Sequence, residues 1–212
     1  MPPNYPVNEE DGDSVTKATT QVGGRGYARG RRAVLVLALL HGILSGVLDC
    51  QTSSQMSHAE AVYLRKILVF VQWPPRPGIP NEVFRVCVAG RYGIGFVLAE
   101  ELRASTVDGQ KIDVRMLPKD QGLMNCQVLF ISEPDVKQRA KLLESVKGTH
   151  VLTVADDKGF LEAGGILEFS SVGNVMQFAV NLPAAKSAGL KIDARLLSLA
   201  RRVVTEKGAT GS

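Results

Sequence analysis

From residue 84 onward, apolar segments of strand length alternate with amphipathic segments of helix length, and this alternation is what most limits the possible folds. Residues 84–89 are rich in β-branched side chains, and residues 126–131 are almost continuously apolar, as in strands covered on both faces. Residues 96–104 and 135–146 show helical periodicity. Strands that alternate with helices predict an α/β fold of three layers, with a mainly parallel sheet flanked by helices.

The remaining segments complete this sheet and its helices. Residues 112–116 and 150–154 have the pattern of further strands, and residues 166–169 and 175–180 predict an antiparallel hairpin at the C-terminal edge of the sheet. Ser57 and Glu60 have the spacing of a capping box, which predicts a buried apolar helix that starts there and ends at Trp73. The apolar spacing within residues 194–204 predicts a last helix.

The N-terminal 50 residues have the pattern of an export signal. Residues 1–32 form a polar segment, predicted to be disordered, with a basic end that contains Arg25, Arg29, Arg31 and Arg32, and residues 33–50 follow as an apolar run. The run is either a cleaved signal peptide or a retained anchor. Cys50 is also a candidate for lipidation, but the preceding Asp49 is evidence against it. The expected units are therefore residues 1–32, 33–50, an exported domain 56–205, and a tail 206–212.

Two cysteines of the predicted domain are candidates for a disulfide. Cys87 and Cys126 are 126 − 87 = 39 positions apart, at equivalent levels of two strands that we expect to be neighbours. Export places them in an oxidising compartment, which favours a bond between them. The alternative is a pair of buried free thiols.

Neither catalysis nor nucleic-acid binding has a clear signature. His58 and His150 lack the ligand spacing of a zinc site, and both cysteines of the domain lie in apolar strands, unlike catalytic thiols. The net charge is only +4, and beyond residue 66 the only adjacent basic pair is Arg201 and Arg202. We therefore expect no enzyme activity, no metal, no cofactor and no nucleic-acid partner.

One weak ligand site is suggested where strands end. The segment 90–95 reads G-x-x-G-x-G, the reverse of the dinucleotide fingerprint, so a plain strand-to-helix turn is favoured there. Asp156 and Asp157 follow another strand, and the carboxyl ends of parallel strands are where α/β proteins bind ligands. Gly90, Tyr92 and Asp156 are thus the candidate pocket residues, with an aspartate-capped turn as the alternative.

The predicted domain contains a series of short blocks in a fixed order, which include Phe70-Val71-x-Trp73-Pro74, Val86-Cys87-Val88, Val151-Leu152-Thr153-Val154-x-Asp156, Gly164-Gly165-Ile166 and Ala188-Gly189-Leu190-Lys191-Ile192. Together these blocks resemble the YfiR family. The resemblance runs from about residue 60 to residue 204. No single block is specific, but their number and order are.

The resemblance implies a periplasmic repressor that binds the sensor region of a membrane diguanylate cyclase, which controls cyclic di-GMP and biofilm formation. It also implies the disulfide Cys87–Cys126, whereas the second cysteine pair of some members has no counterpart here. A sensor kinase is a related partner, and a homodimer is a further assembly to consider. The expected partner-binding residues are Gly164, Glu168, Phe169 and Val172. The alternative function is a periplasmic small-molecule binding protein with its ligand near Gly90 and Asp156.

Overall fold

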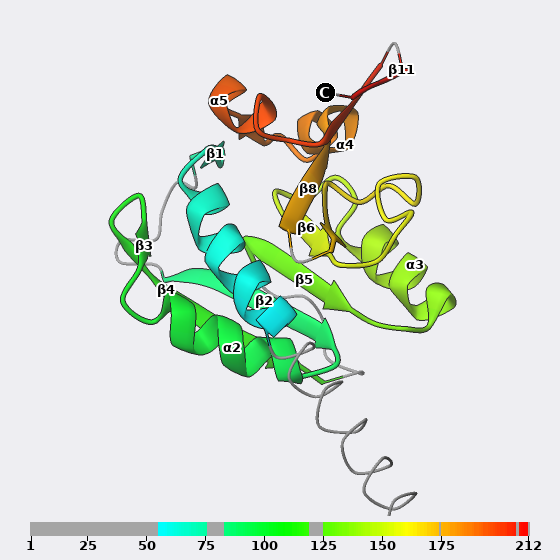
Figure 1. The fold of residues 1–212 in the computed structure, drawn as a ribbon. Coiled ribbons are helices and arrows are strands. Elements are labelled where there is room, and N and C mark those ends of the chain that lie inside the picture. The colour runs from blue at the N-terminus through cyan, green and yellow to red at the C-terminus, as the bar shows by residue number, and fades with distance from the viewer. Residues whose placement is uncertain (1–54, 76–82, 119–124, 174, 207, 212) are drawn as a thin grey trace, which may run out of the picture. The chain divides into compact units, whose positions relative to one another are not determined.

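The computed structural model describes residues 55–75, 83–118, 125–173, 175–206 and 208–211, which belong to one unit, Leu48–Ser212 (Figure 1). The predictions for residues 1–50, including the signal peptide or anchor and the lipidation of Cys50, lie outside the described residues. Within the described ranges, no helix has both the length and the apolar character needed to cross a bilayer.

Nine strands of the described chain form one sheet, in the order β11-β10-β8-β7-β6-β5-β2-β4-β3. In chain order they are β2 (Phe84–Gly90), β3 (Thr106–Val107), β4 (Gln110–Leu117), β5 (Val128–Ser132), β6 (Leu152–Ala155), β7 (Leu167–Val172), β8 (Val175–Asn181), β10 (Arg202–Thr205) and β11 (Gly208–Gly211). Strands β4, β2, β5, β6 and β7 are mutually parallel. A separate pair joins β1 (Val71–Gln72) to β9 (Lys191–Ile192).

Helices cover both faces of the sheet, as the three-layer prediction requires. On one face, a helix over residues 55–68, cyan in Figure 1, and α2 (Gly93–Leu102) pack on alternate side chains of β2, such as Val86 and Val88. On the other face, α3 (Val136–Ser145) brings Leu142 and Leu143 against the layer that holds Cys87 and Ala89. Two shorter helices are α4 (Leu182–Ser187) and α5 (Ala194–Leu197). The predicted fold class is confirmed.

The predicted hairpin is confirmed, but it does not form the edge of the sheet. Strands β7 and β8 pair antiparallel, and β8 also pairs in parallel with β10, which continues into β11. The helix predicted for residues 194–204 ends at Leu197, so its second half was predicted wrongly. Val203, Val204 and Thr205 are β-branched and suit a strand beside β8, and residues 208–211, expected as a tail, pair with them.

The capping box predicted at Ser57 and Glu60 is also absent from its expected place. Residues 55–57 are already helical, so Ser57 lies inside the helix, and Glu60 is 5% exposed. The helix ends at residue 68 rather than at Trp73, because Val71 and Gln72 pair with β9. Trp73 instead donates from its indole N–H to the Gln127 carbonyl oxygen at 3.2 Å and packs edge-on against Phe84.

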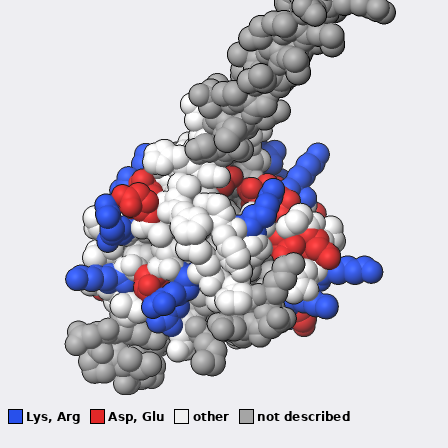
Figure 2. Space-filling model, turned by 90° about the horizontal axis from the view of Figure 1, so that it is seen from below, with Lys and Arg blue, Asp and Glu red and all other residues white. Residues whose placement is uncertain are grey.

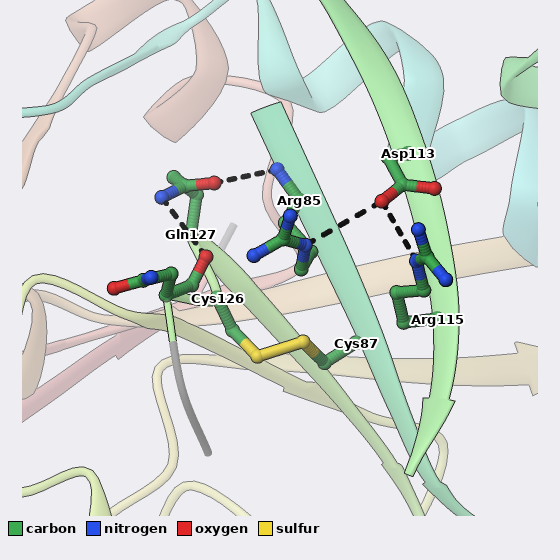
Figure 3. The surroundings of a disulfide bond; sticks show 7 residues. Arg85, Cys87, Asp113, Arg115, Cys126 and Gln127 are labelled. Atoms are coloured by element: carbon green, nitrogen blue, oxygen red, sulfur yellow. Dashed lines mark hydrogen bonds and ion pairs between the residues drawn. A yellow bond between two sulfur atoms is a disulfide. The ribbon is translucent and has the colours of Figure 1, made fainter. Parts of the chain in front are cut away.

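The predicted disulfide joins Cys87 to Cys126, with a Cα–Cα distance of 5.8 Å (Figure 3). Cys87 lies on β2, and Cys126 lies two residues before β5, the strand that pairs with β2. Gln127, next to Cys126, accepts from the backbone N–H of Arg85 through its side-chain oxygen at 2.5 Å. The bond and this side chain therefore fasten the same end of the β2–β5 pair.

Replacement of both cysteines by alanine is expected to lower the free energy of unfolding by about 4 kcal/mol, because the bond closes a 39-residue separation in the unfolded chain. Urea denaturation of the two proteins in their oxidised state measures this difference. Under a reductant the two proteins are expected to unfold at nearly the same urea concentration. Coincident unfolding of the oxidised proteins would contradict a stabilising role for the bond.

Candidate functional site

The carboxyl ends of the parallel strands bring the predicted pocket residues Gly90 and Asp156 to one edge of the sheet. Gly90 pairs with Ser132, and because Phe130 pairs with Val154, Asp156 continues the row on the far side of Ser132. Gly90 has a φ of +98°, and a Cβ there would collide with the Ser132 backbone. The strand spacing places Gly90 and Asp156 on the order of 10 Å apart.

Tyr92, the third predicted pocket residue, lies at the start of α2. The residue is 42% exposed, and its hydroxyl donates to the Leu117 carbonyl oxygen at the end of β4, at 3.1 Å. The backbone N–H of the intervening Arg91 donates to the Ser132 carbonyl oxygen at 2.9 Å. The segment thus forms a strand-to-helix turn, and the side chains of Arg91 and Tyr92 are exposed at this edge.

Glu60 is the residue that sequence reasoning missed at this edge. It comes from the helix over residues 55–68 and is buried, and within the described chain its carboxyl makes no hydrogen bond or ion pair. Its pKa is raised to about 8, first by burial and then by the negative charge of Asp156, while the positive charge of Arg91 acts in the opposite direction. The pKa of Asp156 is also raised, mainly by partial removal from water. We call Glu60, Arg91 and Asp156 the carboxyl-edge cluster.

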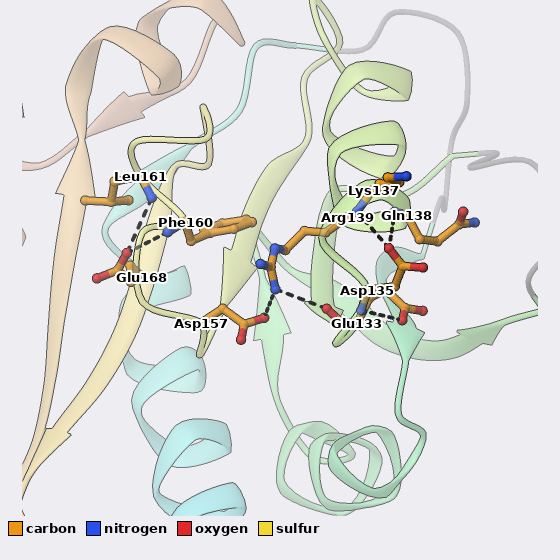
Figure 4. A network of polar contacts seen from close by, with 9 residues as sticks. All are labelled: Glu133, Asp135, Lys137, Gln138, Arg139, Asp157, Phe160, Leu161 and Glu168. Carbon is orange, nitrogen blue, oxygen red and sulfur yellow. Dashed lines mark hydrogen bonds and ion pairs between the residues drawn. The ribbon is translucent and has the colours of Figure 1, made fainter.

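Asp157 does not belong to this cluster, because it forms an ion pair with Arg139 of α3 (Figure 4). The same guanidinium donates to the Glu133 carbonyl oxygen at 3.1 Å. Glu133 in turn accepts from the Asp135 N–H, and Asp135 caps α3 by accepting from the N–H groups of Lys137 and Gln138. Asp157 therefore fastens α3 to the end of β6.

The predicted aspartate cap of the next turn is made by a different residue. Glu168, from β7, accepts from the N–H groups of Phe160 and Leu161 at 2.9 and 3.4 Å (Figure 4). Glu168 and the neighbouring Phe169 are 3% and 1% exposed. Both were predicted to contact a partner, and in this structure neither side chain is accessible to one.

The other two predicted partner residues lie at opposite ends of β7. Gly164 precedes the strand, has a φ of +97° and is exposed, whereas Val172 is its last residue. Val172 pairs with Val175 across the turn, and the two side chains are 63% and 61% exposed. The four residues therefore do not form one surface, and the exposed apolar part is the hairpin tip, defined here as Val172 and Val175.

On the face that Figure 2 shows, basic and acidic side chains lie side by side around an uncharged central area. Oppositely charged side chains of the described chain also form ion pairs, such as Arg65 with Glu101 and Arg202 with Glu162. Among the described residues, no group of three or more His, Cys, Asp or Glu side chains has a geometry that could hold a metal ion.

These features define a three-layer α/β domain, in which one sheet lies between helices. It has a disulfide at the central strands and an exposed apolar hairpin tip. A family model described as YfiR/HmsC-like matches residues 57–201. The chain belongs to the YfiR/HmsC-like family, and members of this family are periplasmic regulators.

Glu60→Gln is expected to remove a pH-dependent loss of stability. In the folded protein the carboxyl has a pKa of about 8, against 4.5 without the fold, so its contribution is fully present below pH 4.5 and is lost as the pH rises to about 8. Over this range the wild type should lose about 1.4 kcal/mol of unfolding free energy per pH unit relative to the variant.

Urea unfolding at intervals from pH 4 to pH 9 measures this slope. Glu144→Gln is the matched control, since Glu144 is exposed on α3 and should leave the slope unchanged. Parallel curves for the wild type and Glu60→Gln would show that Glu60 titrates normally.

Proposed function

We propose that this protein is an exported regulator that binds the periplasmic sensor region of a membrane diguanylate cyclase and holds the enzyme inactive. The single observation that carries this proposal is the match of the YfiR/HmsC-like family model to residues 57–201. The proposal includes the effects on cyclic di-GMP and biofilm formation that the family resemblance implies. The basic and apolar segments before residue 50 support export.

The disulfide supports a periplasmic location, because such bonds persist in oxidising compartments and are rare in the cytosol. It is buried between strands, with Cys87 at 0% and Cys126 at 6% exposed. We assign it a structural rather than a switching role, since a reductant reaches a buried bond poorly.

Repression of this kind acts through a shift in populations. A repressor shifts the equilibrium between the active and inactive conformations of the cyclase only by the difference between its binding free energies for the two. To change the ratio of inactive to active cyclase from 1:99 to 99:1, the repressor must bind the inactive conformation more tightly by about 5.5 kcal/mol. A few well-packed apolar contacts can supply this difference.

The hairpin tip is our candidate contact for the cyclase. Val172 and Val175 are exposed apolar neighbours at the end of two long paired strands, so a partner can bury them without rearrangement of the core. Phe169 of β7 pairs with Phe178 of β8, and both are buried in the core, which fixes the position of the tip.

The carboxyl-edge cluster supports a second candidate, a small-molecule binding function. Glu60 is a buried carboxyl without a hydrogen-bond partner in the described chain, and Asp156 and Arg91 lie near enough to affect its pKa. A ligand with a positively charged or hydroxyl group would pair with this carboxyl.

Val172→Asp is expected to relieve repression, because the new charge must lose its water on contact with an apolar partner surface. The full-length chain is co-expressed with the membrane diguanylate cyclase encoded nearest to its gene, and cellular cyclic di-GMP is measured. The wild type should lower the cyclic di-GMP level, and the variant should bind the solubilised cyclase at least tenfold more weakly.

Val136→Asp is the matched control, since Val136 is 66% exposed at the start of α3, on another element. It should repress as the wild type does. A wild-type chain that neither binds the cyclase nor lowers cyclic di-GMP would contradict the proposed function. Equal repression by Val172→Asp and the wild type would contradict the contact at the hairpin tip.

A further inference from the structure

An apolar hollow with a volume of about 530 Å³ lies at the end of the helix over residues 55–68. It is bounded by the last turn of this helix, by the β3–β4 segment, by β8 and by α5 with the residues that follow it. Its volume falls within the range of about 300–1,000 Å³ that is typical of small-molecule sites. The hollow is distinct from the carboxyl-edge cluster, none of whose residues lines it.

The lining changes from buried at the floor to exposed at the rim. The floor is made of core side chains, with Ile67 and Leu196 each 2% and Phe178 4% exposed. At the rim, Val69 is 68% and Leu199 is 70% exposed, so the apolar lining continues out to the surface. The core therefore opens to solvent here through an apolar mouth.

One uncompensated positive charge lies beside this mouth. Arg65 forms an ion pair with Glu101 at 2.6 Å, and Arg195, which stacks over the lining residue Phe70 at 5.3 Å, forms one with Asp193 at 2.8 Å. Lys66 also lines the hollow and is exposed, and in the part of the chain that the structure describes no carboxylate lies within ion-pair distance of it.

We propose that this hollow binds a monoanionic amphiphile, a molecule with an apolar chain or ring and a single anionic group such as a carboxylate. The apolar part occupies the hollow over Ile67 and Phe178, and the anionic group lies at the mouth, where Lys66 pairs with it. Ser105 and Thr106 line the same hollow, and each carries a hydroxyl group, which is a hydrogen-bond donor.

The shape and the charge together select this class of ligand. An uncharged hydrocarbon would gain the apolar contacts but leave Lys66 without a partner, and a cationic amphiphile would be repelled by it. A hollow of this volume can take up the apolar part of a small molecule, whereas a flat protein surface would leave its floor empty. The proposal does not depend on regulation of a cyclase.

Titration calorimetry with sodium decanoate, decanol and decyltrimethylammonium tests the proposal on the oxidised protein. Decanoate is expected to bind at one site and at least five times more tightly than the other two probes. Octanoate and dodecanoate extend the series, and the affinity should rise about fourfold per methylene as the chain enters the hollow.

Two variants separate the charge from the cavity. Lys66→Gln should reduce the affinity for decanoate to that for decanol, and Lys137→Gln, at an exposed lysine of α3, should leave it unchanged. Leu199→Asp should lower the affinity for all three probes. Because Leu199 is exposed, the variant should retain the wild-type melting temperature.

Three results would overturn the proposal. The first is no saturable binding of decanoate at millimolar concentration. The second is equal affinity for the three probes, or an affinity for decanoate that Lys66→Gln leaves unchanged. The third is concentration-dependent dimerisation that Leu199→Asp abolishes without any amphiphile binding, which would assign the hollow to a second copy of the chain.

Discussion

The parallel pairing of β2 with β5 is the interaction on which the rest of this structure depends. Both strands are covered on both faces, so that Val86 and Val88 meet one helical layer while Cys87 and Ala89 meet the other. The disulfide and the Gln127 side chain hold the start of this pair, and the contact of Gly90 with Ser132 closes its end. Because the pair also sets the row from Gly90 to Asp156, it positions the carboxyl-edge cluster as well.

Elements with strong local signals could be predicted from the sequence, and elements that depend on distant partners could not. The apolar strands β2, β5 and β6 and the hairpin of β7 and β8 have patterns that only buried or half-buried strands explain. Residues 198–204 have the spacing of a helix, yet the open edge of β8 takes Val203 and Val204 as a strand. Tertiary pairing thus overrode a weak local preference.

The same distinction applies to the candidate sites. Cys87 and Cys126 could be paired because each lies at a recognisable strand, and Gly90 and Asp156 because both follow one. Glu60 and Glu168 could not be assigned, since a carboxyl in a helix or strand pattern looks solvent-exposed until the fold buries it. Glu168 is stabilised there by two backbone N–H donors, whereas Glu60 has none in the described chain and its pKa is raised to about 8.

The helix over residues 55–68 contributes residues both to the carboxyl-edge cluster and to the apolar hollow. Glu60 and Ile67 are seven residues apart, which is about 10 Å along the helix axis. Glu60 of the carboxyl-edge cluster and Ile67 at the floor of the hollow therefore lie about two turns apart on the same helix. Ala61, Leu64 and Leu68 anchor the helix in the main core. Both features therefore depend on how this one helix is held against the sheet by its buried side chains.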